Sequence, residues 1–198
     1  MKGFEIRIET NPDVYPPSED TYLLHDAIVT KSDDSLLEIG CGTGYIGLNL
    51  CRRVEHYVGI DVSYSAVENT MENIRKNDLL KRCNVIQSDL LDAVNSRSKF
   101  SIIIFNPPYL PADENHTSLD QALVGGESGA EITLRFIHQA VEHLLPRGRI
   151  YLVVSSLGNP NVIMEAMKEK HLRSEIAAEK ILFYEKLMVL RGVLQNGT

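Results

Sequence analysis

The feature that most constrains the fold of this chain is a regular alternation of short apolar runs with longer segments of helical pattern. Short continuous apolar runs are typical of strands buried on both faces of a parallel sheet. Such runs occur at Leu36–Ile39, Tyr57–Ile60, Asn84–Gln87, Ile102–Phe105 and Ile150–Val154. Helical patterns alternate with them at Ser18–Val29, Gly44–Arg53, Ser63–Asn77, Ala130–Leu145 and Pro160–Lys170. This alternation predicts a parallel sheet with right-handed crossovers and helices on both faces.

Two further strands are expected near the end of the chain, at Arg173–Ala178 and Lys186–Val193. A tight turn would join them as an antiparallel hairpin. The 198 residues suit one domain with a full hydrophobic core. We therefore predict a single α/β domain over residues 1–198, built on a doubly wound, mostly parallel seven-stranded Rossmann-like sheet with an antiparallel C-terminal hairpin.

The charge balance argues against non-specific binding to nucleic acid. The chain carries 20 Lys and Arg residues against 27 Asp and Glu residues, which gives a formal net charge of −7. Binding a phosphate backbone requires clustered basic side chains, and the sequence has no obvious Lys/Arg cluster. Partners other than nucleic acid are therefore expected.

The cysteines and histidines indicate a reducing compartment without a structural metal. Cys41, Cys51 and Cys83 form no CxxC pair, and the six histidines form no spaced metal-binding set. No apolar run approaches the ~20 residues that span a bilayer, and the start of the chain lacks the apolar stretch of a signal peptide. We expect a cytoplasmic protein without a membrane segment.

A glycine-rich turn follows the first predicted strand, in the sequence LLEIGCGTGYIGL. Gly40, Gly42 and Gly44 allow a tight turn and a close approach of the backbone to a ligand. Asp61 ends the second strand about 20 residues later, where a carboxylate can bind a ribose diol. Because Gly42, Gly44 and Gly47 also form a GxGxxG pattern, a nicotinamide or flavin cofactor is an alternative at this point.

Two acidic residues favour S-adenosylmethionine (SAM) as the ligand. Glu38, just before the glycines, would lie against the positively charged methionine end of SAM, whereas it would repel the pyrophosphate of a dinucleotide. Asp89, at the end of the third strand, would accept a hydrogen bond from the adenine amine. Leu90 would add a backbone N–H and an apolar wall. The alternatives are that Asp89 is a helix N-cap and that Glu38 is an ordinary loop carboxylate.

The fourth predicted strand ends abruptly in the sequence FNPPY. Proline cannot donate to a sheet ladder, so strand pairing must stop by Pro107. Asn106 precedes a proline and is therefore held in an extended conformation at the carboxyl end of the strand. In an open α/β sheet, ligands bind at this end. A rigid strand exit is the alternative explanation for the two prolines.

The four residues Asn106–Tyr109 suit methyl transfer to an amide or aryl amine. The obstacle is the nitrogen lone pair, which is delocalised into the carbonyl or the ring. The Asn106 side-chain carbonyl and the Pro107 backbone carbonyl can accept both N–H hydrogens and direct the lone pair toward the methyl group. Pro108 stiffens the turn, and Tyr109 offers a flat face for a planar group.

The chain resembles the NPPY-motif SAM-dependent methyltransferases, and within them the short archaeal and eukaryotic branch of the HemK-like release-factor glutamine methyltransferases. The motifs that carry the resemblance are VYPPSEDT, LLEIGCGTG, GID, SDLL, FNPPY and GGESGAE. The resemblance implies Thr21, Glu38 and Gly40 at the methionine end of SAM and Asp61 at the ribose. It also implies Asp89 and Leu90 at the adenine, with Asn106 between cofactor and acceptor.

The resemblance implies a methyltransferase that acts on a glutamine side-chain amide of a translation release factor. Methylation of the exocyclic amine of adenine in DNA or RNA is the alternative, because the same motif serves both reactions. A SAM-binding scaffold subunit without catalysis is a third. Substrate recognition is expected from the loops around Pro111–Gly126 or from a partner. The third strand, Asn84–Gln87, is expected at a sheet edge, and the resemblance implies that a small zinc-binding activator protein pairs with it.

Overall fold

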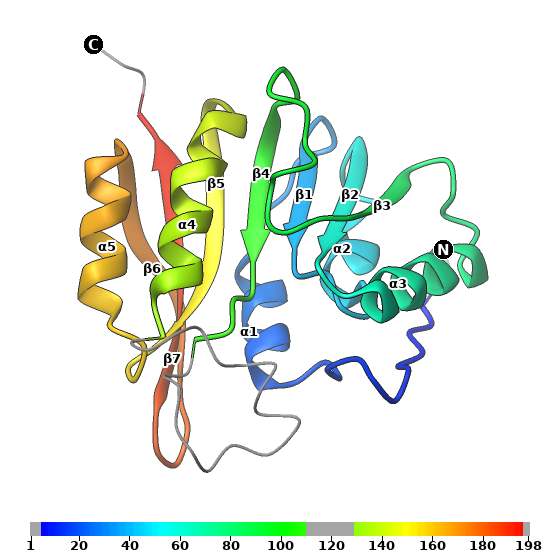
Figure 1. Cartoon of the computed structure of the whole chain (residues 1–198), viewed down its shortest axis with the longest axis horizontal. Helices are drawn as coiled ribbons and strands as arrows, with labels where there is room; N and C mark the ends of the chain where they lie inside the picture. Colours follow the sequence, from blue (N-terminus) through cyan, green and yellow to red (C-terminus); the bar gives the residue numbers. More distant parts are fainter. Residues whose placement is uncertain (1–4, 110–128, 196–198) are drawn as a thin grey trace.

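The computed structural model, which describes residues 5–109 and 129–195, contains one seven-stranded mixed sheet (Figure 1). Its strands lie in the order β3-β2-β1-β4-β5-β7-β6. The first five pair in parallel, β7 runs antiparallel to β5, and β6 pairs antiparallel with β7. The strand bounds are β1 Ser35–Ile39, β2 His56–Asp61, β3 Cys83–Gln87, β4 Phe100–Phe105, β5 Leu144–Ser155, β6 Leu172–Ile181 and β7 Lys186–Leu194. The predicted fold class is confirmed, and β3 lies at an edge of the sheet as expected.

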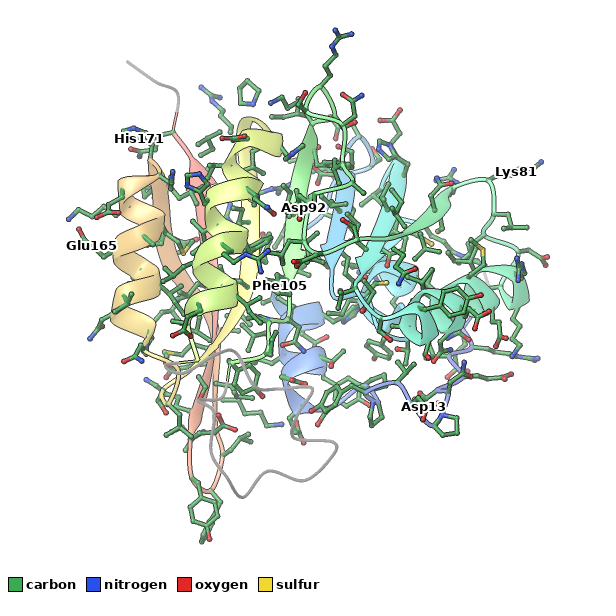
Figure 2. The ribbon with its side chains drawn as sticks, viewed as in Figure 1. Asp13, Lys81, Asp92, Phe105, Glu165 and His171 are labelled. Carbon is green, nitrogen blue, oxygen red and sulfur yellow. The ribbon has the colours of Figure 1, made fainter. Side chains whose placement is uncertain are left out.

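Within the described residues, five α-helices cover the two faces of this sheet (Figure 1), and Figure 2 shows the same view with the side chains added. They are α1 Glu19–Ala27, α2 Tyr45–Leu50, α3 Tyr64–Lys76, α4 Glu131–Ala140 and α5 Pro160–Glu169, and a short 3-10 helix, Val141–His143, follows α4. One buried cluster joins the sheet to α1, α2 and α3, and a second joins it to α4 and α5. Alternate residues of β1 belong to opposite clusters, with Leu36 in the first and Leu37 in the second. The strand is therefore buried on both faces, which explains its continuous apolar sequence.

The strand β5 begins at Leu144 and not at the predicted Ile150, and α4 ends at Ala140 instead of Leu145. The sequence LLPRGRI contains a proline and a glycine, which indicate a turn. In the structure this stretch still pairs with β4 through an irregular register between Phe100 and Ile102. Arg147 takes a left-handed φ of 61° and absorbs the distortion.

Two asparagines on α3 and a third at its C-cap hold the extended N-terminal segment against the helix. Asn69, Asn73 and Asn77 are spaced one helical turn apart, so their side chains lie in one row. Their Oδ1 atoms accept backbone N–H groups of residues 7–11 at 2.9–3.0 Å, and their Nδ2 atoms donate to backbone carbonyls of the same segment at 2.8 Å. The segment continues into residues 13–17, which form part of the pocket described below.

Within residues 5–109 and 129–195, no helix combines the length and the apolar character that a bilayer crossing needs. The loops expected to recognise the substrate, around Pro111–Gly126, lie outside the described residues, as does most of the GGESGAE motif.

Candidate active site

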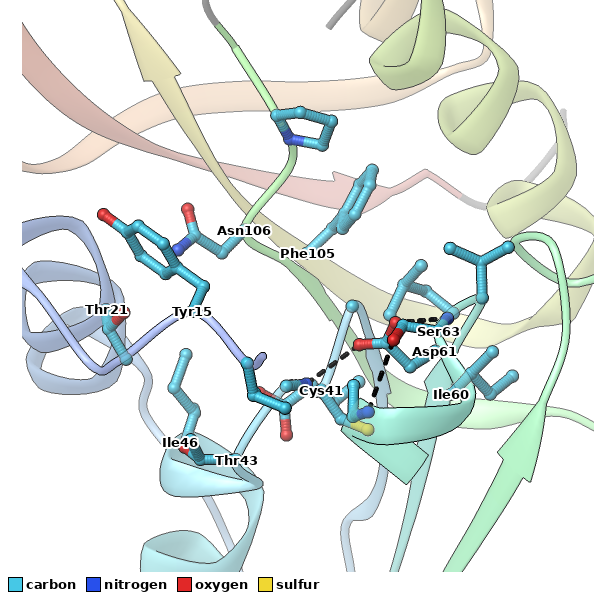
Figure 3. A pocket seen from close by; sticks show the side chains of 18 of the residues that line it. Tyr15, Thr21, Cys41, Thr43, Ile46, Ile60, Asp61, Ser63, Phe105 and Asn106 are labelled. Carbon is cyan, nitrogen blue, oxygen red and sulfur yellow. Dashed lines mark hydrogen bonds between the residues drawn. The ribbon is translucent and has the colours of Figure 1, made fainter. Parts of the chain in front are cut away.

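A pocket of about 400 Å³ opens at the carboxyl ends of β1, β2 and β4 (Figure 3). This volume is within the range of small-molecule sites. Its floor is the glycine turn after β1, and the N-terminal segment forms a wall through Asp13, Val14, Tyr15 and Pro17. Figure 3 shows Asn106, Tyr15 and Thr21 at one end of the pocket and Asp61 and Ser63 at the other.

Most of the residues expected to bind the cofactor line this pocket, although they come from separate parts of the chain. The lining includes Thr21, Glu38, Gly40, Gly42, Asp61, Asp89, Leu90, Asn106 and Pro108. Three expected site residues are not part of the lining: Gly44, Pro107 and Tyr109. Gly44 is the N-cap of α2, with a left-handed φ of 77°, and it shapes the turn from outside the pocket.

Asp61 connects the end of β2 to the glycine turn after β1. Its Oδ2 atom accepts the backbone N–H of Gly42 and its Oδ1 atom accepts that of Ser63, both at 2.9 Å. Burial raises the pKa of the Asp61 carboxyl above its usual value, although these hydrogen bonds oppose the shift. The carboxylate is therefore fixed in direction at the pocket surface.

Glu38 is almost fully buried under the glycine turn, with 4% of its surface exposed. Its Oε2 atom accepts hydrogen bonds from the Tyr57 hydroxyl at 2.7 Å and from the Gly47 N–H at 3.0 Å. A residue with a side chain does not fit at position 47, because its Cβ atom would lie 2.0 Å from the Tyr57 ring. The last glycine of the GxGxxG pattern is thus explained by packing between α2 and β2.

Burial raises the pKa of Glu38 to about 8, while the hydrogen bonds from Tyr57 and Gly47 lower it and the nearby Asp61 charge raises it. Glu38 is therefore mostly protonated at neutral pH in the protein alone. A cation bound beside it would favour the ionised form.

This pKa predicts a pH dependence of stability. Because the folded pKa of Glu38 is about 8 and its ordinary value is 4.5, its contribution to the free energy of unfolding is complete below pH 4.5 and is lost as pH rises to about 8. The difference in stability between the wild type and Glu38→Gln should change by up to about 1.4 kcal/mol per pH unit in this window. Urea unfolding at pH 5, 6.5 and 8 measures it. Parallel pH profiles for the two proteins would contradict the assignment.

Asn106 lies half-buried where β4 ends, and it lines the same pocket as Tyr15 (Figure 3). Its Oδ1 atom is buried and has no hydrogen-bond partner among residues 5–109 and 129–195. A buried carbonyl oxygen without a donor costs free energy unless a ligand supplies one. An N–H donor in the pocket would therefore be stabilised at this position.

Tyr109 is not part of the pocket lining, so its ring does not form the flat wall that the sequence predicted. Only 5% of its surface is exposed, and its ring belongs to the buried cluster on the α1–α3 face. Its hydroxyl donates to Asp20 Oδ2 at 3.4 Å, and burial together with the Asp20 and Glu185 charges raises its pKa. Aromatic lining comes instead from Tyr15, Tyr45 and Phe105, which sequence reasoning did not single out. Tyr15 belongs to the VYPPSEDT motif, which was the available signal.

Asp89 forms an ion pair that sequence reasoning missed. Its Oδ2 atom lies 2.9 Å from Nη2 of Arg135 on α4, and both side chains are about half exposed. Turns, not a helix, follow Asp89, so the N-cap alternative does not apply. The next residue, Leu90, takes a left-handed φ of 48°, which costs a non-glycine residue free energy and is typical of ligand-binding positions.

Comparison with known proteins identifies relatives over nearly the whole chain. Residues 5–183 match the model of the methyltransferase small domain family. A protein of Methanocaldococcus jannaschii, provisionally named a protein N5-glutamine methyltransferase, is 34% identical over 94% of this chain and 95% of its own length. Methyltransferase HEMK2 of Mus musculus is 32% identical over 90% of this chain and 89% of its own length.

Among solved structures, the Mtq2–Trm112 complex of E. cuniculi matches with a TM-score of 0.73 and 26% identity, over 92% of this chain and 99% of that one. That complex is described as responsible for methylation of the translation termination factor eRF1.

Proposed function

Because this chain belongs to the methyltransferase small domain family, we propose that it transfers a methyl group from SAM to the side-chain amide nitrogen of a glutamine in a translation release factor. The observation that carries the proposal is the buried Oδ1 atom of Asn106 at the pocket, which has no hydrogen-bond partner in the part of the chain that the structure describes. The named activities of the M. jannaschii protein and of the Mtq2–Trm112 complex support the glutamine and the release factor. A release factor as substrate implies the cytoplasm.

The lining of the pocket fits SAM. When bound, SAM supplies a methyl group on a positively charged sulfur. We assign Glu38 to its cationic end, with Thr21 and Gly40 nearby, because a cation offsets the cost of ionising this buried acid. Asp61 would accept from the ribose hydroxyls, and Asp89 and Leu90 would hold the adenine. A ligand with a pyrophosphate would bring negative charge toward this acid and would gain nothing from its ionisation, so NAD fits less well.

Asn106 orients the methyl acceptor in this proposal. Its Oδ1 atom accepts one N–H of the glutamine amide, and the backbone carbonyl of Pro107 accepts the other. Both contacts strengthen as the nitrogen becomes pyramidal and positively charged, so they stabilise the transition state more than the bound substrate. Pro108 fixes the turn. Tyr109 holds the turn from the buried side, through Asp20.

Adenine presents an NH₂ group and a flat face as well, so Asn106 alone does not choose between the acceptors. The charge of the chain favours a protein acceptor, because a net charge of −7 gives little to neutralise phosphates. A buried Asn106 Oδ1 atom without a hydrogen-bond donor destabilises the unliganded protein, and a scaffold without catalysis would gain nothing from it.

Label transfer from radioactive SAM tests the choice of acceptor. With release factor and an adenine-containing oligonucleotide at equal concentrations and physiological salt, we expect the label on the release factor. Label found mainly on the oligonucleotide would contradict the proposal. Replacing the acceptor glutamine by alanine in the release factor is the control, and it should abolish the signal.

We further propose that a small zinc-binding activator protein pairs with β3, and the solved complex of Mtq2 with Trm112 supports a partner protein. This strand is an edge of the sheet, and Ile86 on it is 37% exposed. An apolar edge strand with unpaired backbone groups favours addition of another strand. The label-transfer assay with and without such a protein tests this. Full activity of the chain alone, unchanged by the added protein, would contradict it.

A further inference from the structure

The turn of the β6–β7 hairpin carries exposed apolar side chains that neither the pocket nor the core uses. Ile181, Phe183 and Tyr184, which we call the hairpin tip, are 79%, 89% and 86% exposed. The rings of Phe183 and Tyr184 contact each other edge to face, with centroids 4.5 Å apart. Large aromatic residues exposed together are uncommon on a surface without a partner, and they are enriched in protein–protein hot spots.

The hairpin tip is held in a defined position. The N–H of Leu182 donates to the Glu185 carbonyl at 2.8 Å, which closes the turn. Ser155 Oγ, at the end of β5, donates to Glu185 Oε2 at 2.5 Å, and an ion pair joins Lys180 to Glu19 on α1. A fixed apolar surface loses little conformational entropy when a partner binds it.

The hairpin tip lies at the same end of the sheet as Asn106. Because β7 is antiparallel to β5, its first residues lie beyond the carboxyl ends of the parallel strands, and Figure 1 shows the turn extending past β4 and β5. Phe105 pairs with Leu152, which pairs with Leu190, and Lys186 begins the strand four residues earlier. Tyr184 and Phe183 precede Lys186 by two and three residues, so two strand spacings and six to seven residue rises place the tip roughly 20–25 Å from the end of β4.

The base of the hairpin also reaches the NPPY motif. Glu185 is close enough to Tyr109 for its charge to raise the pKa of that hydroxyl. The backbone carbonyl of Tyr109 lies next to Gly158 on the loop after β5, where an added Cβ atom would approach it to 2.5 Å. The base of the hairpin therefore lies near the residue that ends the NPPY motif.

We propose that the hairpin tip is a docking surface for the methyl-acceptor protein. An apolar surface of the acceptor protein packs against the tip while the acceptor glutamine lies at Asn106. A standard protein–protein interface of ~800 Å² per partner is roughly 30 Å across, so one interface with Asn106 near one side can include the tip near the other. A small-molecule acceptor would leave the tip uncovered. The inference depends on the proposed function and extends it to the recognition of the substrate protein.

The double variant Phe183→Ser/Tyr184→Ser tests the proposal. We expect kcat/KM for release factor to fall at least tenfold, because exposed aromatic anchors are lost. A five-residue peptide centred on the acceptor glutamine extends only about 7 Å to each side and does not reach the tip. Its kcat/KM should stay unchanged, as should SAM affinity and the unfolding temperature. Val29→Ser, at the opposite end of the sheet and 64% exposed, is the matched control and should change none of these values.

The possible outcomes separate the two proposals. Unchanged kcat/KM of the double variant on release factor overturns the docking role, and so does an equal loss on protein and peptide. If the peptide is too poor a substrate to measure, the Kd of the enzyme for release factor is measured instead, with S-adenosylhomocysteine bound. The double variant should raise this Kd at least tenfold. A shift from dimer to monomer in sedimentation, with substrate affinity unchanged, would assign the tip to a second copy of this chain. A wild type that does not methylate release factor overturns the proposed function first, and the docking role with it.

Discussion

Asn106→Ala is expected to reduce kcat for methyl transfer by about 100-fold or more, while the Kd for SAM changes little. The lost oxygen acts on the acceptor nitrogen as charge develops there, so its removal affects the transition state more than cofactor binding. Because the Oδ1 atom is buried without a partner, the substitution also removes a destabilising group. The unfolding temperature should therefore not fall. Single-turnover rates, calorimetry with SAM and thermal unfolding measure the three quantities.

Asn95→Ala is the matched control for this variant. Asn95 lies on an exposed loop before β4, and its side chain accepts only the nearby N–H of Arg97 among the hydrogen bonds found. It should retain wild-type kcat. If Asn106→Ala keeps half of the wild-type turnover, Asn106 serves only to end the strand and the proposed mechanism is wrong.

Asp61→Ala should weaken SAM binding by about 10- to 150-fold, since a charge-assisted hydrogen bond contributes ~1.5–3 kcal/mol. The product S-adenosylhomocysteine has the same ribose, so its affinity should fall by a similar factor. The variant also loses the bond from the Asp61 carboxylate to the Gly42 N–H, which loosens the glycine turn. Calorimetry with both ligands measures the effect.

Asp33→Ala controls for the loss of an acidic residue. Asp33 is exposed and precedes β1, at the end of the sheet away from the pocket. Its removal should leave both affinities unchanged. NAD binding tighter than SAM in the wild type, or undiminished SAM binding by Asp61→Ala, would contradict the assignment of the pocket.

The sheet and the pocket end of the fold were predictable because their signals are local. Apolar runs, the glycine turn and the two prolines after Asn106 each act on the backbone where they occur. The start of β5 was not predictable, since Pro146 and Gly148 indicate a turn and only pairing with β4 keeps the stretch extended. Tertiary pairing here overrides local preference.

The positions of Tyr109 and Asp89 depend on residues far away in the sequence. The Tyr109 hydroxyl donates to Asp20 on α1, and its backbone carbonyl packs closely against Gly158, so the ring lies in the core. Asp89 meets Arg135 on α4. The row of asparagines on α3 could be recognised as periodic, but its partner, an extended segment about 60 residues earlier, follows no pattern that spacing reveals.

The central claim is that the amide nitrogen of a release-factor glutamine receives the methyl group, and mass spectrometry of the product tests it most directly. Release factor is incubated with the chain, the proposed activator protein and SAM carrying a deuterated methyl group, then digested and fragmented. The account predicts the deuterated methyl on one glutamine side chain, present with the wild type and nearly absent with Asn106→Ala. A methyl group on another type of residue, or equal labelling by Asn106→Ala, would contradict it.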